Sequence, residues 1–530
     1  MAALTPKTDA AGPQPTIAFV GFMGAGKTRA TKGAGAVLGE HATDADREIE
    51  RELGEPISDF FERQGEAAFR EVEERVCVEL LSRGGLVALG GGAVQSPRVR
   101  AALEDCFTVW CRVSEEVAWE RCLGDDDRPL AGDREAFARR LSERDPLYES
   151  VADAVLGDGG ERTGRRAAPW LRATAGLPGA RLAWAESASA EYPAIVGPGA
   201  LSLLGGQTPT HRPLPGGLTP TRWFAVADST ALGHHRALLP ALAATIEVAG
   251  GEESKTMREA ERVLRELAAA GARRDDGVLA FGGGVAGDLG GFCAATYQRG
   301  VPVAQAPTTL VAQVDSAYGG KTGVDLPEAK NYAGAYHMPL AVLADPATLA
   351  TLPDEELAAG FAEVVKTALI AGGPLWERVR ALESLDPGGL ADVIFACARA
   401  KLDIVAEDER DAGRRAVLNL GHTIGHAIEA AAGYGRYRHG EAIALGLLAA
   451  LQLSGAGELR AEVRGLLERH GLPVQLDPAI DTALVLAAVE RDKKASAAGV
   501  GFVLLERPGE PRTGQSVDGA MVRSALEELR

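Results

Sequence analysis

A glycine-rich segment near the N-terminus has the composition of a phosphate-binding loop. GFMGAGKT (residues 21–28) follows an apolar stretch and precedes sequence with helical periodicity. Glycines let backbone N–H groups point at phosphate oxygens, and the N-terminus of the next helix adds positive potential. In such a loop Lys27 reaches the terminal phosphates and the Thr28 hydroxyl holds Mg²⁺. The pattern predicts a nucleotide-binding loop rather than an ordinary turn, made by Gly21, Gly24, Ala25, Gly26, Lys27, Thr28 and Arg29.

Two carboxylates follow this loop in the sequence. Asp44 and Asp46 stand two residues apart, so both side chains face one side if this segment is the end of a strand. Such a pair can serve Mg²⁺ and a substrate hydroxyl. A solvated acidic turn is the alternative.

Three of the nine histidines lie close together in the second half of the chain. His422 and His426 are four residues apart, which stacks them on one face of a helix. His439 follows a loop rich in glycine and aromatic residues. Glu363, further upstream, would complete a set of two histidines and one carboxylate, which suits a catalytic Zn²⁺ with an open position. A lone histidine in a helix is more often buried than a ligand, but the clustering favours a metal site.

A second glycine-rich turn, GGGVAG (residues 282–287), follows the apolar run GVLAF. Taken alone it is weak evidence for a dinucleotide. The supporting residues are Glu252, Lys255, Asp288, Thr308 and Thr309. Together they favour a nicotinamide dinucleotide site over an ordinary tight turn.

Short apolar strands alternate with helical segments twice along the chain, which predicts parallel sheets covered by helices. We expect an α/β fold class, with a P-loop domain at residues 16–157, a Rossmann-like α/β subdomain at 181–345 and a helical subdomain at 346–530. Residues 1–15 are expected to be a disordered lead-in. The Gly-, Arg- and Ala-rich residues 158–180 are expected to be a linker.

Composition excludes several classes of protein. The formal net charge of −18 argues against nucleic-acid binding, which needs clustered Lys and Arg. No apolar run approaches the length of a membrane span, and the N-terminus lacks the apolar core of a secretory signal. None of the six cysteines forms a CxxC pair. We therefore expect reduced, mostly buried thiols in a cytoplasmic protein.

The segments ISDFFERQGEAAFREVE, LGGGAV, DRPLAG and ERDPLYESVA follow the phosphate loop in this order. The series resembles shikimate kinase over residues 16–157. The resemblance implies that Asp44 lies near Mg²⁺, that the arginines clamp the carboxylate of shikimate, and that Arg128 closes over the transferred phosphoryl group. By resemblance the shikimate-binding residues are Asp46, Arg70, Gly91, Gly92 and Arg144, and the catalytic residues are Lys27, Asp44 and Arg128.

The segments GGGVAGDLGGFCAATYQRG, APTTLVAQVDSAYGGKTGVDLPEAKNYAGAYH, FAEVVKTAL, LNLGHTIGHAIE, RHGEA and DKKASAAGVGFVLL resemble 3-dehydroquinate synthase. The resemblance runs from about Arg181 to the C-terminus. It implies that Glu363, His422 and His439 bind Zn²⁺ or Co²⁺, and that Arg299 is contributed across a dimer interface. The implied NAD-binding residues are Asp228, Glu252, Lys255, Gly283, Gly284, Val285, Asp288, Thr308, Thr309, Lys321 and Lys330. The implied substrate-binding residues are Arg299, Asp315, Lys321, Asn331, Lys366, Lys401, Arg415, Asn419, His426 and Lys493, among which Lys321, Lys366 and His426 are catalytic.

The two resemblances together imply a bifunctional, homodimeric enzyme of the shikimate pathway. One site would phosphorylate shikimate with ATP and Mg²⁺. The other would convert a seven-carbon sugar acid phosphate to 3-dehydroquinate with NAD and a divalent metal. A metal- and NAD-dependent polyol dehydrogenase fused to a P-loop kinase is one alternative, although a neutral polyol needs no array of lysines. A regulatory protein with a degenerate kinase is another, although the kinase residues are all present.

Overall fold

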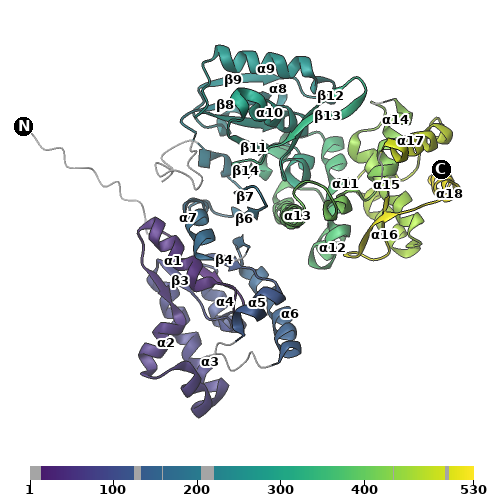
Figure 1. The fold of residues 1–530 in the computed structure, drawn as a ribbon. Helices are drawn as coiled ribbons and strands as arrows, with labels where there is room; N and C mark the ends of the chain where they lie inside the picture. Colours follow the sequence, from purple (N-terminus) through teal and green to yellow (C-terminus); the bar gives the residue numbers. More distant parts are fainter. Residues whose placement is uncertain (1–13, 124–132, 158, 205–219, 434, 496–500) are drawn as a thin grey trace, which may run out of the picture. The chain divides into compact units, whose positions relative to one another are not determined.

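The computed structural model describes residues 14–123, 133–157, 159–204, 220–433, 435–495 and 501–530. Within these ranges the chain forms two compact units (Figure 1), an N-terminal unit that ends at Trp184 and a C-terminal unit that begins at Ala185. Of the lead-in expected at residues 1–15, only Gln14 and Pro15 lie among the described residues. Within the described ranges every helix is too short or too polar to cross a membrane.

The N-terminal unit is built on a parallel sheet. Its strands are β1 (Ile17–Val20), β2 (Ala42–Asp44), β3 (Leu86–Ala88), β4 (Phe107–Cys111), β5 (Ala154–Leu156) and β6 (Arg181–Glu186), in the order β2-β3-β1-β4-β5-β6. All residues of β1, β3, β4 and β5 are buried, as strands of a parallel sheet covered by helices must be.

Helices connect these strands in the alternation that the sequence predicts. They are α1 (Lys27–Leu38), α2 (Ala45–Leu53), α3 (Ile57–Arg83), α4 (Pro97–Leu103), α5 (Glu115–Cys122), α6 (Arg134–Val151) and α7 (Glu161–Ala175). Gly65, with a φ of 82°, interrupts α3. Side-chain caps start several of them, as where Ser114 accepts a hydrogen bond from the N–H of Val117 at the start of α5.

The prediction of a linker at residues 158–180 is wrong for most of that segment. Residues Glu161–Ala175 form α7, which buries Ala167, Ala168, Trp170 and Leu171 and packs against α1. The small residues that suggested a linker instead permit close helix packing. A Cβ added to Gly164 would lie 2.1 Å from the carbonyl oxygen of Ala30, so only glycine allows the two backbones to approach this closely.

The strands of the C-terminal unit also pair in parallel, which confirms the expected α/β class. Its strands are β7 (Glu191–Val196), β8 (Trp223–Asp228), β9 (Ala244–Val248), β10 (Gly277–Gly282), β11 (Val303–Pro307) and β14 (Ala341–Ala344), in the order β7-β14-β11-β10-β8-β9. The helices between them are α8 (Ser229–His235), α9 (Met257–Ala269) and α10 (Gly284–Thr296). An antiparallel hairpin, β12 (Lys321–Leu326) and β13 (Ala329–Tyr336), packs on α10.

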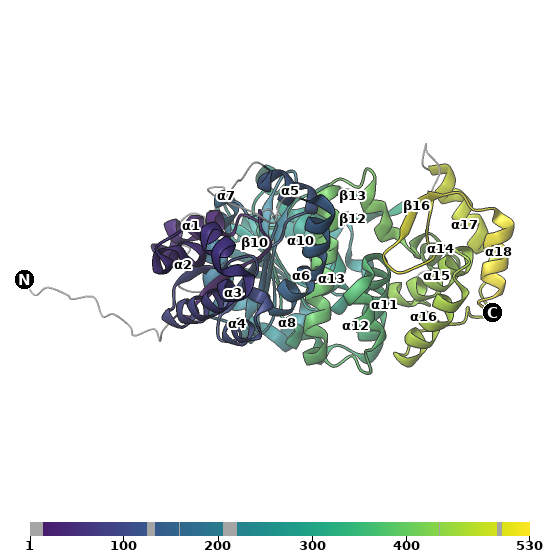
Figure 2. The same cartoon turned by 90° about the horizontal axis from the view of Figure 1, so that it is seen from below.

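Helices dominate the rest of this unit, as expected from residue 346 onward. They are α11 (Asp354–Ala371), α12 (Gly373–Arg380), α13 (Pro387–Glu407), α14 (His422–Ala432), α15 (His439–Leu453), α16 (Gly457–Arg469), α17 (Thr482–Ala495) and α18 (Gly519–Glu527). The views of Figures 1 and 2 both place α15 among α11, α14 and α16. A short hairpin that the sequence did not suggest, β15 (Phe502–Leu505) and β16 (Pro511–Gln515), packs on α15.

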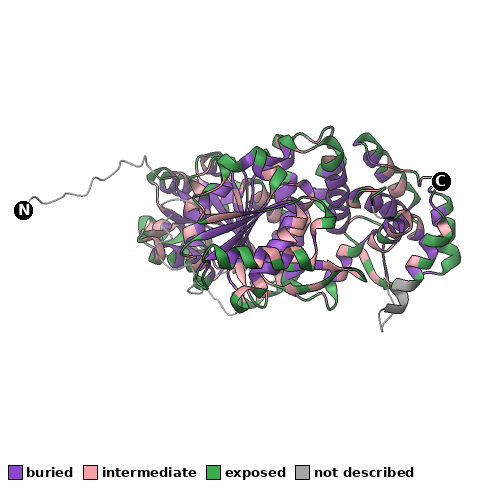
Figure 3. Cartoon of the chain, turned by 90° about the horizontal axis from the view of Figure 1, so that it is seen from above, coloured by how far each residue is buried: buried purple, intermediate pink, exposed green. Residues whose placement is uncertain are grey.

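Burial follows the layers of each unit. In Figure 3 the central strands of the parallel sheets are buried, whereas the edge strands β2 and β9 are partly exposed and many helices expose one side. Five of the six cysteines are buried and Cys106 is half-buried, and all six are free thiols. The expected placement of the thiols is therefore confirmed.

We expect Gly164→Ala to destabilise the N-terminal unit by about 1–3 kcal/mol, because the added methyl group must push α7 away from the backbone of α1. Urea denaturation of the whole chain should show the unfolding transition of this unit at a lower urea concentration. Gly176→Ala is the matched control, since a Cβ there meets its nearest neighbour at 3.4 Å. Equal midpoints for the two variants would contradict the close packing of α7 on α1.

Candidate active sites

The phosphate loop lies between β1 and α1, where the sequence places it. Gly24 and Gly26 both have a φ of 77°, a conformation that favours glycine. Gly26 is the residue that precedes the first turn of α1, and no side chain caps that turn. A Cβ on Gly26 would lie 1.5 Å from the carbonyl oxygen of Gly159. The N-terminus of α1 therefore opens onto the loop, a position that favours an anion.

The two residues expected to hold Mg²⁺ lie in contact. The Thr28 hydroxyl donates a hydrogen bond of 2.6 Å to the Asp44 carboxylate. That carboxylate also accepts the N–H groups of Asp46 and Arg47 and so caps α2. One hydroxyl and one carboxylate oxygen side by side at the loop are the protein oxygens that Mg²⁺ in a nucleotide site uses.

Asp46 lies close to the glycine loop of residues 90–92. A Cβ on Gly90 would come within 2.8 Å of the Asp46 carboxylate and within 2.6 Å of Glu73. Although solvent still reaches the side chain of Asp46, the surrounding protein atoms, followed by the charge of Asp44, raise its pKa to about 6. A carboxylate with a raised pKa is suited to accept a proton from a substrate hydroxyl.

The arginines expected to bind the acceptor carboxylate lie on either side of this loop. A Cβ on Gly92 would clash with the guanidinium of Arg70, at 2.1 Å. Arg144 donates to the carbonyl oxygen of Gly91 at 3.4 Å. The structure therefore brings Asp46, Arg70, Arg144 and the glycine loop together. Arg128, expected to close over the phosphoryl group, lies outside the described residues.

Two residues that the sequence analysis missed hold this arrangement. Glu73 is buried and pairs with Arg70 at 2.6 Å. Tyr148 is fully buried and donates a hydrogen bond of 2.6 Å to the carbonyl oxygen of Gly91. The spacing of Glu73, three residues after Arg70 on α3, could have suggested the first contact.

Several of the residues expected to bind NAD gather at the carboxyl ends of β8, β10 and β11, whereas Lys321 and Lys330 lie on the hairpin of β12 and β13. Asp228 ends β8, the glycine-rich turn joins β10 to α10, and Thr308 and Thr309 follow β11. A Cβ on Gly283 would lie 3.0 Å from the methyl group of Thr309. Ligands of open parallel sheets bind at this edge.

A buried lysine stands beside that turn. Lys255 is 2.8 Å from Glu252, 3.3 Å from Asp288 and 4.0 Å from Asp325. Burial, against the opposing charge of Lys255, raises the pKa of Asp288 to about 6. The expected residues Glu252, Lys255 and Asp288 are therefore brought together, and Asp325 is a member that the sequence analysis missed.

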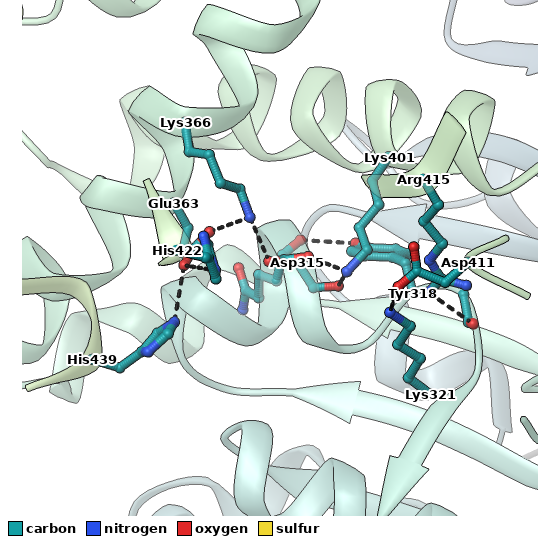
Figure 4. A network of polar contacts seen from close by, with 12 residues as sticks. Asp315, Tyr318, Lys321, Glu363, Lys366, Lys401, Asp411, Arg415, His422 and His439 are labelled. Atoms are coloured by element: carbon teal, nitrogen blue, oxygen red, sulfur yellow. Dashed lines mark hydrogen bonds and ion pairs between the residues drawn. The ribbon is translucent and has the colours of Figure 1, made fainter. Parts of the chain in front are cut away.

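The proposed metal ligands come from three different helices. Glu363 on α11 is fully buried, and His422 and His439 are the first residues of α14 and α15. The Glu363 Oε1 atom lies 3.5 Å from His422 Nε2 and 3.1 Å from His439 Nε2 (Figure 4). Two donors bound to one tetrahedral Zn²⁺ are roughly 3.4 Å apart. The residues therefore fit a divalent metal.

His426 lies beside this trio and is more exposed. Its ring centre is 5.2 Å from that of His422 and 5.7 Å from that of His439. Ligand atoms of the three histidines lie within 4.8 Å of one another. Glu363 approaches His422 and His439 at 3.5 and 3.1 Å, so this carboxylate and the three histidines offer possible donors around one position.

The charges of the trio suit a cation. Burial, followed by the nearby Lys366, lowers the pKa of His422 to about 3. Its imidazole is therefore neutral and can donate a lone pair. Burial opposes the charge of Glu363, but the charge of Lys366 and the hydrogen bond with His439 outweigh it and hold the pKa of this carboxyl far below its usual range. Burial also opposes a charge on His439, yet its hydrogen bonds to Glu363 and Glu429 raise its pKa to about 9. The surrounding carboxylates thus favour a positive charge at this position, and a bound metal would supply that charge in place of the Nε2 proton.

Asp315 links the metal centre to the lysines. Lys366 lies 2.5 Å from Glu363 and 3.0 Å from Asp315, and Lys401 forms an ion pair with Asp315 from α13 (Figure 4). Burial favours a neutral Asp315, but the two lysines outweigh it and keep its pKa well below the usual range. The result is a buried row of alternating charges that ends in the lysine of α13.

Lys321 and Arg415 lie on the Lys401 side of this row, away from the metal ligands (Figure 4). Lys321, the first residue of β12, pairs with Asp411, and Arg415 donates to the carbonyl oxygens of Gly319 and Glu409. Arg415 is 2% exposed, and among the described residues its Nε atom has no hydrogen-bond partner. A buried guanidinium with a free N–H is suited to an anionic substrate.

The remaining expected substrate residues are less constrained. Asn331 lies on the hairpin with a φ of 54°, and the Asp325 carboxylate accepts its N–H at 2.6 Å. Arg299, with a φ of 71°, and Asn419 are exposed. Lys493 lies in α17, but its side chain is outside the described part of the structure.

The fold and geometry are those of a P-loop phosphotransferase followed by an α/β enzyme with a dinucleotide turn and a histidine–carboxylate centre. The shikimate kinase family model matches residues 23–172. The models for the N-terminal and C-terminal parts of 3-dehydroquinate synthase match residues 245–359 and 360–495.

Curated relatives agree with these matches. The 3-dehydroquinate synthase of Symbiobacterium thermophilum is 40% identical over 362 residues, which cover 65% of this chain and 99% of the relative. That of Gloeobacter violaceus is 43% identical over 296 residues, covering 54% and 82%. The chain belongs to the 3-dehydroquinate synthase family, and its N-terminal unit is a shikimate kinase domain.

Solved structures of two synthases share the fold of the C-terminal unit. A 2-deoxy-scyllo-inosose synthase complexed with carbaglucose-6-phosphate, NAD⁺ and Co²⁺ is 26% identical with a TM-score of 0.57, covering 66% of this chain and 100% of that structure. The 2-epi-5-epi-valiolone synthase of Streptomyces hygroscopicus, with NAD⁺ and Zn²⁺ bound, is 27% identical with a TM-score of 0.57, covering 65% and 98%.

We expect Asp315→Asn to lower the free energy of unfolding by about 3–5 kcal/mol, because it leaves Lys366 and Lys401 buried without their shared counter-ion. Denaturant titration of the metal-free protein measures this loss. Glu247→Gln removes an exposed ion pair with Arg236 and should lower the free energy of unfolding by less than about 1 kcal/mol. A similar small cost for both variants would argue against the buried charge row.

Proposed function

We propose that this chain catalyses two reactions of the shikimate pathway at separate sites. The N-terminal site phosphorylates shikimate to shikimate 3-phosphate with ATP and Mg²⁺. The C-terminal site converts 3-deoxy-D-arabino-heptulosonate 7-phosphate to 3-dehydroquinate and phosphate, with NAD and Zn²⁺ or Co²⁺. The observation that supports the second reaction most strongly is the meeting of Glu363, His422 and His439 with the row of lysines around Asp315.

At the kinase site the chain supplies positioning and charge. The loop N–H groups and Lys27 bind the phosphates of ATP, and Thr28 and Asp44 hold Mg²⁺. Arg70 and Arg144 bind the carboxylate of shikimate, and Asp46 receives the proton of the attacking hydroxyl. In phosphoryl transfer such positioning and charge neutralisation supply most of the catalysis.

At the synthase site the chain holds a doubly anionic substrate. Lys321, Lys366, Lys401 and Arg415 bind its phosphate and carboxylate. His426 is exposed beside the metal ligands and can move a proton to or from the sugar oxygens. When bound, NAD would remove a hydride from a hydroxyl-bearing carbon and later return it, and a metal held by the three ligands would polarise the oxygen on that carbon. Since NAD is regenerated, the net reaction is an elimination and ring closure.

A polyol dehydrogenase is the alternative with the same kinds of cofactor. A neutral polyol gives no role to the buried charges of Lys366 and Lys401, or to the Nε–H of Arg415, which has no partner within the described part of the chain. A dehydrogenase would accumulate NADH in step with product, whereas the synthase releases phosphate with no net NADH. Measuring both products in one reaction separates the two functions.

We further propose that the protein is a cytoplasmic homodimer, in which Arg299 reaches the synthase site of the second copy. The exposure of Arg299 and its φ of 71° at the end of the α10 segment support a role outside its own unit. Light scattering on the purified chain measures the mass. A monomer that retains full synthase activity would contradict this proposal.

We expect Lys27→Ala to abolish shikimate phosphorylation and to leave the synthase reaction near its original rate. His422→Ala should do the reverse. Each substitution removes a side chain that belongs to only one of the two proposed sites. The two activities are assayed separately on both variants and on the unchanged protein. Loss of both activities in either variant would contradict independent sites.

Removal of divalent metal should separate the activities in a second way. After dialysis against a chelator, adding Mg²⁺ alone is expected to restore the kinase reaction, because Thr28 and Asp44 offer oxygen ligands. The synthase reaction should return only with Zn²⁺ or Co²⁺, which nitrogen ligands favour. Recovery of the synthase reaction with Mg²⁺ alone would argue against the histidine-containing centre.

A further inference from the structure

One buried carboxylate beside the metal centre has no part in the functions described so far. The side chain of Glu429 is 7% exposed. Its Oε2 atom lies 3.3 Å from His439 Nδ1, and its Oε1 atom lies 3.5 Å from Lys330 Nζ. Burying a carboxylate costs free energy unless hydrogen bonds compensate for the lost water. The position of Glu429 therefore needs these two contacts, and the one to the ring is the shorter.

The helix places Glu429 beside the histidines by simple spacing. His422, His426 and Glu429 are residues i, i+4 and i+7 of α14, so they share one face of that helix. His439 is the first residue of α15, which packs against α14. The ring of His439 thus lies between the Glu429 carboxylate on one side and the Glu363 carboxylate on the other.

The two histidines of the metal centre are oriented in parallel ways. In both, the Nε2 atom faces Glu363. The Nδ1 atom of His422 lies 3.2 Å from the carbonyl oxygen of Leu420, and the Nδ1 atom of His439 faces Glu429. A histidine that binds a metal through one nitrogen generally donates the N–H of the other nitrogen to a carbonyl or a carboxylate. Each ring therefore has an acceptor at the nitrogen that points away from the centre.

We propose that Glu429 is a positioning residue that orients His439 and fixes its proton on Nδ1, so that the Nε2 lone pair faces the metal. This inference rests on the proposed function, since it assigns a partner to one of its three metal ligands. In this role Glu429 is a partner of a ligand and not a ligand itself. A negatively charged acceptor at Nδ1 also makes the Nε2 lone pair a stronger ligand for a metal. The neutral carbonyl that accepts from His422 has a weaker effect of this kind.

Lys330 does not explain the burial of Glu429 by itself. The lysine side chain is 40% exposed and lies 3.5 Å away, and exposed ion pairs contribute little. If Glu429 served only Lys330, its removal would disturb the hairpin and leave the metal affinity unchanged. If it serves His439, the metal affinity must fall.

The test measures metal binding directly. Wild type, Glu429→Gln and Glu429→Ala are stripped of metal and titrated with Zn²⁺ against a chromophoric chelator. We expect the affinity of Glu429→Gln to fall about 10-fold and that of Glu429→Ala up to about 100-fold. The absorption spectrum of the Co²⁺-loaded protein should shift in both variants, because the angle of one imidazole ligand changes.

Glu409→Gln is the matched control. Glu409 is a buried carboxylate of the same unit, 8% exposed, but it accepts hydrogen bonds from Ser189 rather than from a histidine. Its variant should bind Zn²⁺ within about twofold of wild type. A Glu429→Gln protein that also binds Zn²⁺ within twofold, or that fails to fold while Glu409→Gln folds, would overturn the positioning role. A wild-type chain that binds no Zn²⁺ or Co²⁺ would overturn the proposed synthase function as well.

Discussion

The synthase site depends on one buried row of charges. Lys366 lies between Glu363 and Asp315, and Asp315 in turn pairs with Lys401 (Figure 4). None of these charges can be left alone in the protein interior without a large cost. The row therefore holds α11, α13 and the segment before the hairpin at fixed positions. It also joins the metal ligands to the lysines that meet the anionic substrate, so both parts of the reaction share one framework.

Local motifs predicted the positions of residues that belong to one helix, one strand or one turn. The phosphate loop between β1 and α1 and the stacking of His422 near His426 each depend on a few neighbouring residues, and the structure contains both. The strand expected to carry Asp44 and Asp46 ends at Asp44, because α2 begins at Ala45 and places Asp46 in its first turn. Contacts between distant elements were not accessible in this way. Glu429 stands in the same motif as His426, but its contact depends on where α15 returns the ring of His439. Tyr148 likewise meets the glycine loop only after the sheet is assembled.

At residues 158–180 the local sequence predicted a linker, but the structure contains a helix over most of the segment. Glycine and proline in it suggested a break in structure, since both disfavour isolated helices. The helix forms nonetheless, because Gly164 allows it to approach Ala30 and because Trp170 and Leu171 become buried. Tertiary packing outweighs local propensity here. The information lies in the partner helix α1, whose Gly33 makes a matching close approach to Glu161.

The presence of two compact units in one polypeptide has a consequence for the cell. Every ribosome that completes the chain makes one copy of each unit, so their abundance cannot drift apart through separate transcription, translation or turnover. The two reactions are not consecutive, so no intermediate needs to pass between them. A constant dosage ratio is an advantage that requires no contact between the two catalysts.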